Sequence, residues 1–204
     1  MIPIHCLGDS ITQAGGLPEC GRWTVVLQMR LEAWRPGAYA VYTNGVGGDT
    51  TAMGLERMGV AERDGGVTLI EFGFNDAACR PFGLRPRVGP EEYRANLHAM
   101  GEIVRNRGGE PLFVVNHRIN FTETEPQSDG EYYGEKMERY NRICREVAES
   151  LDAATVDLSK LMAERKVDPA EFFADGVHLS ASGNRTYADL VFGVLRPILE
   201  GRAP

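Results

Sequence analysis

The sequence predicts an α/β fold organised around a five-stranded parallel β-sheet. Five short apolar runs of strand length alternate along the chain with segments in which apolar residues recur at helical spacing. Parallel strands must be joined by long crossover connections, which are usually helices, so this alternation favours a parallel sheet. The 204 residues show no repeat, low-complexity tract or interdomain linker, and we expect one domain spanning residues 1–204.

The first predicted strand, residues 2–7, ends abruptly in small and polar residues. Gly8, Asp9 and Ser10 follow it directly, so the Ser10 hydroxyl would be presented at the carboxyl end of a strand. A serine in that position is a candidate nucleophile, provided that a base and donors to an oxyanion come from elsewhere in the chain.

The first half of the chain supplies two crossover helices and two further strands. The first helix is expected over residues 23–34, where apolar residues recur at helical spacing until a Pro-Gly pair stops them. A strand at 38–43 leads into a glycine-rich turn at 44–50, whose glycines permit positive φ and close backbone approach. A helix at 53–61 precedes the most strand-like run of the chain, 67–72.

The second half of the chain continues the alternation. A proline opens one helix and a glycine pair ends it, as is typical of helix termini. Pro169 interrupts a weaker helical pattern, and Ser180 is the expected N-cap of the last helix. In order, the elements are a helix at 90–107, a strand at 112–116, a helix at 133–151, a strand at 154–156, a broken helix at 160–173 and a helix at 181–198. Two long connections, 77–89 and 118–130, lack periodicity, and such loops are often functional.

Charge and hydropathy exclude two classes of protein. The net charge of -7 argues against a nucleic-acid binder, because affinity for the phosphate backbone requires clustered Lys and Arg. No apolar run approaches the roughly 20 residues that cross a bilayer, and the amino terminus lacks a signal-peptide pattern. We therefore expect a cytoplasmic protein with neither a nucleic-acid nor a membrane partner; the sequence leaves the oligomeric state open.

The cysteines indicate neither a disulfide framework nor a metal site. Cys6, Cys20, Cys79 and Cys144 are scattered along the chain without a Cys-x-x-Cys pair. This spacing disfavours a structural zinc site and a thioredoxin-like redox motif, so we expect free thiols.

The residues after the predicted strands supply the groups needed for acyl transfer. Ser10, Gly48 and Asn75 each follow a strand, so a parallel sheet brings them to one edge. Ser10 can attack an ester, and His178 can take its proton because an imidazole titrates near neutrality. Asp175 lies three residues before His178 and can fold back to orient the imidazole. The backbone amides of Ser10 and Gly48, with the carboxamide of Asn75, can donate to the oxyanion.

In this pattern the chain resembles the SGNH (GDSL-type) hydrolases. Four family blocks occur in family order over essentially the whole chain: Gly8-Asp9-Ser10 followed by Ile11-Thr12, the glycine turn with Gly48, Gly73-x-Asn75-Asp76, and Asp175-x-x-His178. One block departs from the family, because Asn116-His117-Arg118 stands where relatives commonly have proline-containing strand ends.

The resemblance implies a flavodoxin-like, three-layer α/β/α sandwich and a Ser-His-Asp triad. Ser10 would be the nucleophile, Asp175 and His178 would complete the triad, and Gly48 and Asn75 would complete an oxyanion hole that begins at the Ser10 amide. It further implies that no metal and no organic cofactor is used, and that the partner is a small-molecule ester substrate.

We interpret the chain as a serine esterase for small or medium acyl esters, with O-acetyl groups on carbohydrates among the candidates. A thioesterase or lysophospholipase with the same triad is the nearest alternative. An alternative of a different class is a non-catalytic, flavodoxin-like protein that holds a nucleotide phosphate in the glycine turn at 45–48.

Several polar residues near these blocks have structural interpretations. Asp9 and Asp76 are expected to accept hydrogen bonds from loop amides. His117 follows a strand at the same sheet edge and either reaches the substrate or, as we prefer, is a satisfied structural histidine. His5 and His98 are expected to be structural. Four arginines either form a basic rim that favours anionic substrates or belong to solvated loops, namely Arg80, Arg85, Arg87 and Arg118.

Overall fold

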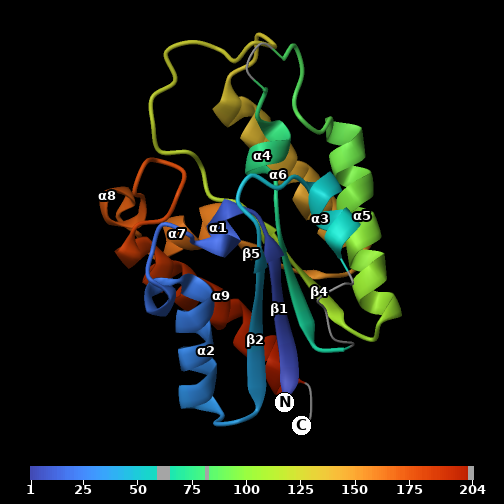
Figure 1. Cartoon of the computed structure of the whole chain (residues 1–204), viewed down its shortest axis with the longest axis vertical. Coiled ribbons are helices and arrows are strands. Elements are labelled where there is room, and N and C mark those ends of the chain that lie inside the picture. Colours follow the sequence, from blue (N-terminus) through green and yellow to red (C-terminus); the bar gives the residue numbers. More distant parts are fainter. Residues whose placement is uncertain (59–64, 81–82, 202–204) are drawn as a thin grey trace.

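A five-stranded parallel sheet lies at the centre of the protein (Figure 1). The computed structural model describes residues 1–58, 65–80 and 83–201. The strands lie in the order β2-β1-β3-β4-β5, so the predicted parallel sheet is confirmed. They are β1 (Ile2–Gly8), β2 (Tyr39–Gly45), β3 (Val67–Glu71), β4 (Glu110–Val115) and β5 (Ala154–Asp157).

Helices cover both faces of the sheet and give the expected α/β/α sandwich. Helices α2 and α9 pack together on one face, whereas α3, α5 and α6 lie on the other (Figure 1). The long helices are α2 (Trp23–Trp34), α5 (Pro90–Asn106), α6 (Tyr133–Ser150) and α9 (Ala181–Glu200). The shorter ones are α1 (Ser10–Gln13), a 3₁₀ turn (Glu19–Gly21), α3 (Thr51–Arg57), α4 (Phe74–Ala77), α7 (Leu158–Glu164) and α8 (Pro169–Phe172).

The strand register brings three loops to one edge of the sheet. Gly8, the last residue of β1, pairs with Gly45 of β2 and with Glu71 of β3. The segments that follow these three strands therefore start side by side. They are α1, the glycine turn and α4, and α1 and α4 lie above the carboxyl ends of the strands in Figure 1.

Trp23 ties the first of these segments to the helix layer. Its side chain is fully buried, and its indole Nε1 donates to the Ile11 carbonyl at 2.9 Å. Its backbone N–H donates to Oδ1 of Asn184 on α9 at 3.0 Å, and its ring packs on Tyr187. The short helix α1 is thus anchored in the core although it is too short to be stable alone.

The helix boundaries differ from the prediction in a few places. The helix expected at 53–61 begins at Thr51, whose N–H and hydroxyl both bond to Asp76; it ends at Arg57, and residues 59–61 lie outside the described residues. The broken helix expected at 160–173 is the pair of short helices α7 and α8, and Pro169 opens the second of them rather than interrupting it. Ser180 caps α9 as predicted, with Oγ accepting from Gly183 N–H at 2.9 Å. The single turns α1 and α4 were not predicted, since four residues carry no periodicity.

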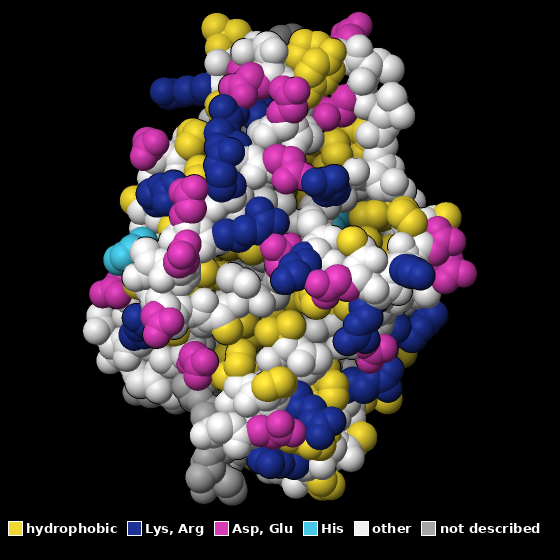
Figure 2. Space-filling view, turned by 180° about the vertical axis from the view of Figure 1, so that it is seen from behind, with side chains coloured by type: hydrophobic (Ala, Val, Ile, Leu, Met, Phe, Trp, Pro, Cys, Tyr) yellow, Lys and Arg dark blue, Asp and Glu magenta, His cyan; other side chains and the backbone are white. Residues whose placement is uncertain are grey.

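The surface carries mixed charge. On the face shown in Figure 2, Lys and Arg side chains are interspersed with Asp and Glu rather than gathered into one field. All four cysteines are free, as expected. Within the described residues, no helix is both long and apolar enough to span a bilayer.

Candidate active site

Ser10 lies at the start of the single helical turn that follows β1. Asp9 caps this turn, with Oδ1 accepting from Ile11 N–H at 2.9 Å, and the turn closes with a bond from Ala14 N–H to the Ser10 carbonyl. A Cβ on Gly8 would lie 2.3 Å from the Thr12 hydroxyl, so only glycine fits immediately before the turn. The local structure therefore explains why a glycine and an aspartate precede Ser10.

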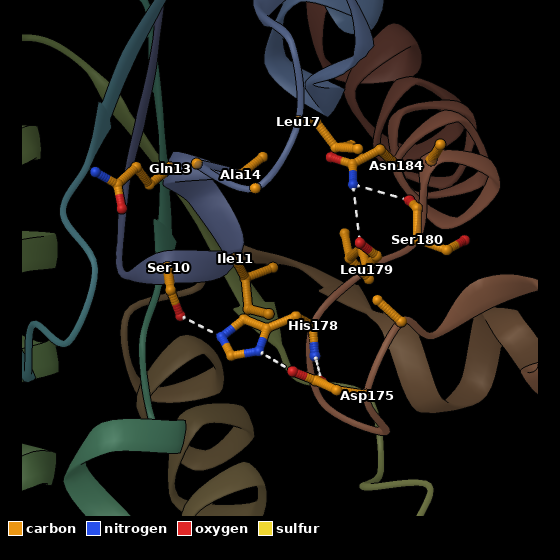
Figure 3. Close-up of a pocket in the computed structure, with 14 residues that line it drawn as sticks. Ser10, Ile11, Gln13, Ala14, Leu17, Asp175, His178, Leu179, Ser180 and Asn184 are labelled. Atoms are coloured by element: carbon orange, nitrogen blue, oxygen red, sulfur yellow. Dashed lines mark hydrogen bonds and ion pairs between the residues drawn. The ribbon is translucent and has the colours of Figure 1, made fainter.

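The structure brings Ser10, His178 and Asp175 into one hydrogen-bonded chain (Figure 3). Ser10 Oγ lies 3.0 Å from His178 Nε2, although the two residues are separated by 168 positions in the sequence. His178 Nδ1 donates to Asp175 Oδ2 at 2.7 Å. With Nδ1 protonated, Nε2 has a lone pair to accept the serine proton.

Asp175 is held as a carboxylate. Partial burial alone would raise its pKa, but hydrogen bonds from the His178 ring and from two backbone N–H groups outweigh this and lower the pKa to about 2. Its Oδ1 accepts from His178 N–H at 2.7 Å and from Val177 N–H at 3.0 Å. The carboxylate is therefore fixed toward the imidazole and stays charged at neutral pH.

Asn75 lies on α4 beside the same hydroxyl. Its Nδ2 donates to Asp9 Oδ2 at 3.0 Å, and its Oδ1 accepts from Arg87 Nη1 at 3.4 Å. An amide nitrogen carries two hydrogens, so the bond to Asp9 leaves one for a ligand. Asn75 lines a cavity together with Ser10 and His178, as a donor to an oxyanion must.

The glycine turn is held against the nucleophile. Gly48 adopts φ +83°, a conformation that favours glycine. Its neighbour Gly47 donates its N–H to Gln13 Oε1 at 3.0 Å, and a Cβ on Gly47 would lie 3.9 Å from Ser10 Cβ. Arg57 joins the turn to the end of β1, because its guanidinium donates to Asp49 and to the Gly8 carbonyl. The role of Gly48 as an oxyanion donor stays a prediction.

Buried carboxyl groups support the site from within the sheet. Glu71 is nearly inaccessible, and its Oε2 accepts from the Thr12 hydroxyl at 3.0 Å and from Asp9 N–H at 3.4 Å. Burial raises the pKa of Glu71 to about 7 and that of Asp9 well above its ordinary value. Asp76 is buried as well and accepts two bonds from Thr51, so the predicted structural roles of Asp9 and Asp76 agree with their contacts.

Glu71 was not singled out in the sequence, yet a signal for it was present. A glutamate inside the apolar run 67–72 is unusual, because a charged residue in a central strand needs partners. Gln13 and Arg57, which fix the glycine turn, carried no such signal.

Two cavities open on either side of the Ser10–His178 pair. The larger, of about 840 Å³, lies between the segment around Leu17 and the start of α9 near Asn184 (Figure 3). The smaller, of about 310 Å³, is walled by Phe74, Ala78, Tyr133 and Val177. Tyr133 is fixed there by a bond from its hydroxyl to the Phe74 carbonyl at 2.8 Å. An ester bound at Ser10 would have room for a group on each side.

The basic rim is only partly as expected. Arg87 approaches Asn75, as described above. Arg118 forms an ion pair with Glu138, is largely exposed and lines cavities that do not contain Ser10, which agrees with the solvated-loop alternative rather than with the basic rim. The parts of Arg80 and Arg85 stay predictions.

The other three histidines lie apart from the nucleophile. His5 is buried and stacks on Tyr42, and His98 is exposed on α5. His117 is buried and its Nε2 bonds to the Val177 carbonyl, but it is satisfied only in part, because Nδ1 has no hydrogen-bond partner among the residues that the structure describes. Over those same residues, no three His, Cys, Asp or Glu side chains converge in a group that could hold a metal ion.

The chain is similar in sequence to known proteins. Residues 6–186 match the GDSL-like Lipase/Acylhydrolase family. Esterase TesA of Pseudomonas aeruginosa is 30% identical over 207 residues, covering 95% of this chain and 87% of that protein. The isoamyl acetate-hydrolyzing esterase 1 homolog of Bos taurus is 28% identical over 147 residues, and the match covers 66% of this chain and only 55% of that protein.

Solved structures show the same fold. A crystal structure of TesA superposes with a TM-score of 0.73 at 26% identity, covering 96% of this chain and 98% of that one. The acetyl xylan esterase AlAXEase superposes with a TM-score of 0.76 at 22% identity, covering 94% and 98%. The second likeness concerns the fold alone.

Proposed function

Because the chain belongs to the GDSL-like lipase/acylhydrolase family and is a carboxylic ester hydrolase, we propose that it is a serine esterase for small or medium acyl esters. The observation that carries this proposal is the line of hydrogen bonds from Ser10 Oγ through the His178 ring to Asp175. We further propose that residues 1–204 act as one catalytic domain.

Acylation begins at the Ser10 hydroxyl. His178 Nε2 removes its proton while Oγ attacks the ester carbonyl carbon, and the carbonyl oxygen becomes an oxyanion. The amides of Ser10 and Gly48 and the carboxamide of Asn75 donate to that oxygen. Asp175 stabilises the imidazolium that forms, because it remains ionised and bonded to Nδ1.

The same imidazole completes the turnover. His178 returns its proton to the leaving alcohol as the tetrahedral intermediate collapses, which leaves the acyl group on Ser10. A water molecule then loses a proton to Nε2 and attacks the acyl carbon, and the carboxylic acid leaves as Ser10 regains its hydrogen.

The size of the smaller cavity favours a short acyl or alcohol group. At about 310 Å³, with Phe74, Ala78, Tyr133 and Val177 among its lining residues, it has room for an acetyl or similarly small group and less room for a fatty acyl chain than the cavity of about 840 Å³ on the other side of Ser10. The name of the Bos taurus relative, which specifies an acetate ester, supports the same substrate class. We therefore place acetyl esters, including those on carbohydrates, ahead of thioesters and lysophospholipids.

Family membership and the glycine turn both disfavour a non-catalytic nucleotide-binding protein. A phosphate site needs free backbone N–H groups, and the N–H of Gly47 is already bonded to Gln13. Nor would such a protein require Ser10, His178 and Asp175 to be linked.

A fluorophosphonate probe tests the proposal directly. We expect stoichiometric labelling of Ser10 in the wild-type protein, and no labelling and no turnover of p-nitrophenyl acetate in Ser10→Ala. Ser150→Ala, which alters an exposed serine on α6, is the matched control and should behave as the wild type. Labelling at another residue, or an active Ser10→Ala protein, would contradict the proposal. A series of p-nitrophenyl esters of increasing length, beside acetylated sugars, then identifies the acyl group.

A further inference from the structure

His117 lies directly behind the loop that carries Asp175 and His178. It follows β4, it is fully buried, and its Nε2 lies 2.8 Å from the carbonyl oxygen of Val177. A carbonyl can only accept, so Nε2 must carry a hydrogen, and in the neutral ring Nδ1 is then unprotonated. Burial lowers the pKa of His117 to about 4, which keeps this single neutral tautomer at the pH values where esters are hydrolysed enzymatically.

The His117 ring also contacts the segments on either side of the nucleophile. It packs on Phe74, the residue before Asn75 on α4, with ring centroids 4.9 Å apart. It packs on Phe173 at 5.0 Å and on Phe172 at 5.7 Å, where the loop of Asp175 and His178 begins. One side chain therefore touches both the segment of the proposed oxyanion donor and the segment of the proposed base.

Hydrogen bonds rather than core packing hold the loop of Asp175 and His178. The side chains of His178 and Asp175 are 50% and 56% exposed, so core packing does not fix them. The loop is closed at its base by a bond from Ala174 N–H to the His178 carbonyl, and Asn120 N–H bonds to the Gly176 carbonyl. The bond from His117 holds the carbonyl of Val177, the residue directly before His178.

We propose that His117 is a positioning residue: its Nε2–H bond to the Val177 carbonyl holds the His178 imidazole at proton-transfer distance from Ser10. This inference rests on the proposed Ser-His-Asp mechanism. A loop free to move by about 1 Å would lose the 3.0 Å contact between His178 and Ser10, and misplacement of that size can cost about a hundredfold in rate.

Two substitutions separate this bond from general packing. His117→Gln retains a side-chain N–H that can reach the Val177 carbonyl, whereas His117→Leu fills the space without a donor. We expect His117→Leu to lower kcat for p-nitrophenyl acetate by about tenfold to a hundredfold with little change in KM, and His117→Gln to retain most of the activity. His98→Gln on the exposed side of α5 is the control and should match the wild type.

The rate of fluorophosphonate labelling at Ser10 distinguishes failure of this inference from failure of the proposed function. Slower labelling in His117→Leu, with full labelling at the end point, supports the positioning role. A wild-type protein that is not labelled at Ser10 overturns the mechanism itself. If the wild type is labelled at Ser10, two results would overturn the inference alone. One is an equal kcat in the wild type and in His117→Leu, and the other is an equal loss of kcat in His117→Leu and in His117→Gln.

Nuclear magnetic resonance of the wild-type protein gives a test that needs no substitution. The ¹⁵N shifts of His117 should show the Nε2–H tautomer across pH 5 to 8, with the hydrogen slow to exchange with water. An Nδ1–H tautomer, in which Nε2 carries no hydrogen to donate to the Val177 carbonyl, would overturn the inference.

Discussion

Replacing Glu71 with glutamine should remove a pH-dependent loss of stability. Glu71 is buried in β3, and its Oε2 bonds to Thr12 and to Asp9 N–H, while Oε1 has no hydrogen-bond partner among the described residues. Burial raises its pKa from the ordinary 4.5 to about 7. The folded protein therefore holds this proton more strongly than the unfolded chain does.

The difference in the pKa of Glu71 between the folded and unfolded states sets the sign and the size of the change in stability with pH. The stabilisation is fully present below about pH 4.5 and is lost as the pH rises through about 7. The complete loss corresponds to about 3 kcal/mol of unfolding free energy, of which about 2 kcal/mol falls between pH 5 and pH 8. Glutamine keeps an oxygen that can accept from Thr12 and Asp9 but has no proton to lose.

Urea unfolding followed by the fluorescence of the buried Trp23 measures this effect. We expect Glu71→Gln to gain about 2 kcal/mol relative to the wild type when the pH is changed from 5 to 8. Glu149→Gln, which alters an exposed residue on α6, should give no such trend. A difference between the wild type and Glu71→Gln that is constant over this range would refute the reasoning.

Three further predictions concern the site and its support. In Gly45→Ala, the new Cβ would lie 2.2 Å from the backbone nitrogen of Gln13, so we expect a loss of about 3 kcal/mol in urea unfolding and lower esterase activity. Gly89→Ala, with open space around the new Cβ and a position outside the cavities beside Ser10, should change neither, and equal stability of the two variants would be contrary to this steric account. Asp175→Asn should fold normally but lower kcat by about three to four orders of magnitude, since the imidazole loses the partner that sets its tautomer. Steady-state kinetics on p-nitrophenyl acetate measure this loss, and near-normal turnover would remove Asp175 from the triad. The lowered pKa of Asp175, about 2, keeps this carboxylate ionised, so it should add no step to the rate profile above about pH 4. A histidine base in general predicts a rate that falls toward acid pH, and a rate that is flat from pH 5 to 8 would argue against one.

The local pattern of the sequence was sufficient for the architecture and for the candidate residues. Alternation of apolar runs with helical periodicity predicts the five parallel strands, because backbone periodicity and burial are properties of contiguous residues. The residues directly after the strands were expected at one sheet edge, and the register of Gly8 with Gly45 and Glu71 places them there. Ser10, His178 and Asp175 were chosen for their chemistry and their family blocks, and the structure brings them together.

Contacts between distant segments could not be predicted in the same way. The 3.0 Å approach of Ser10 to His178, the bond from His117 to Val177 and the burial of Glu71 beneath Thr12 each join residues from separate elements. The chain around each residue does not fix such contacts, because they depend on how the elements pack and on which side chains exclude water. The sequence by itself therefore determined the sheet and the chemistry available at its edge. Only the tertiary structure decided the distances, the cavity walls and the pKa values, which arise from packing and desolvation.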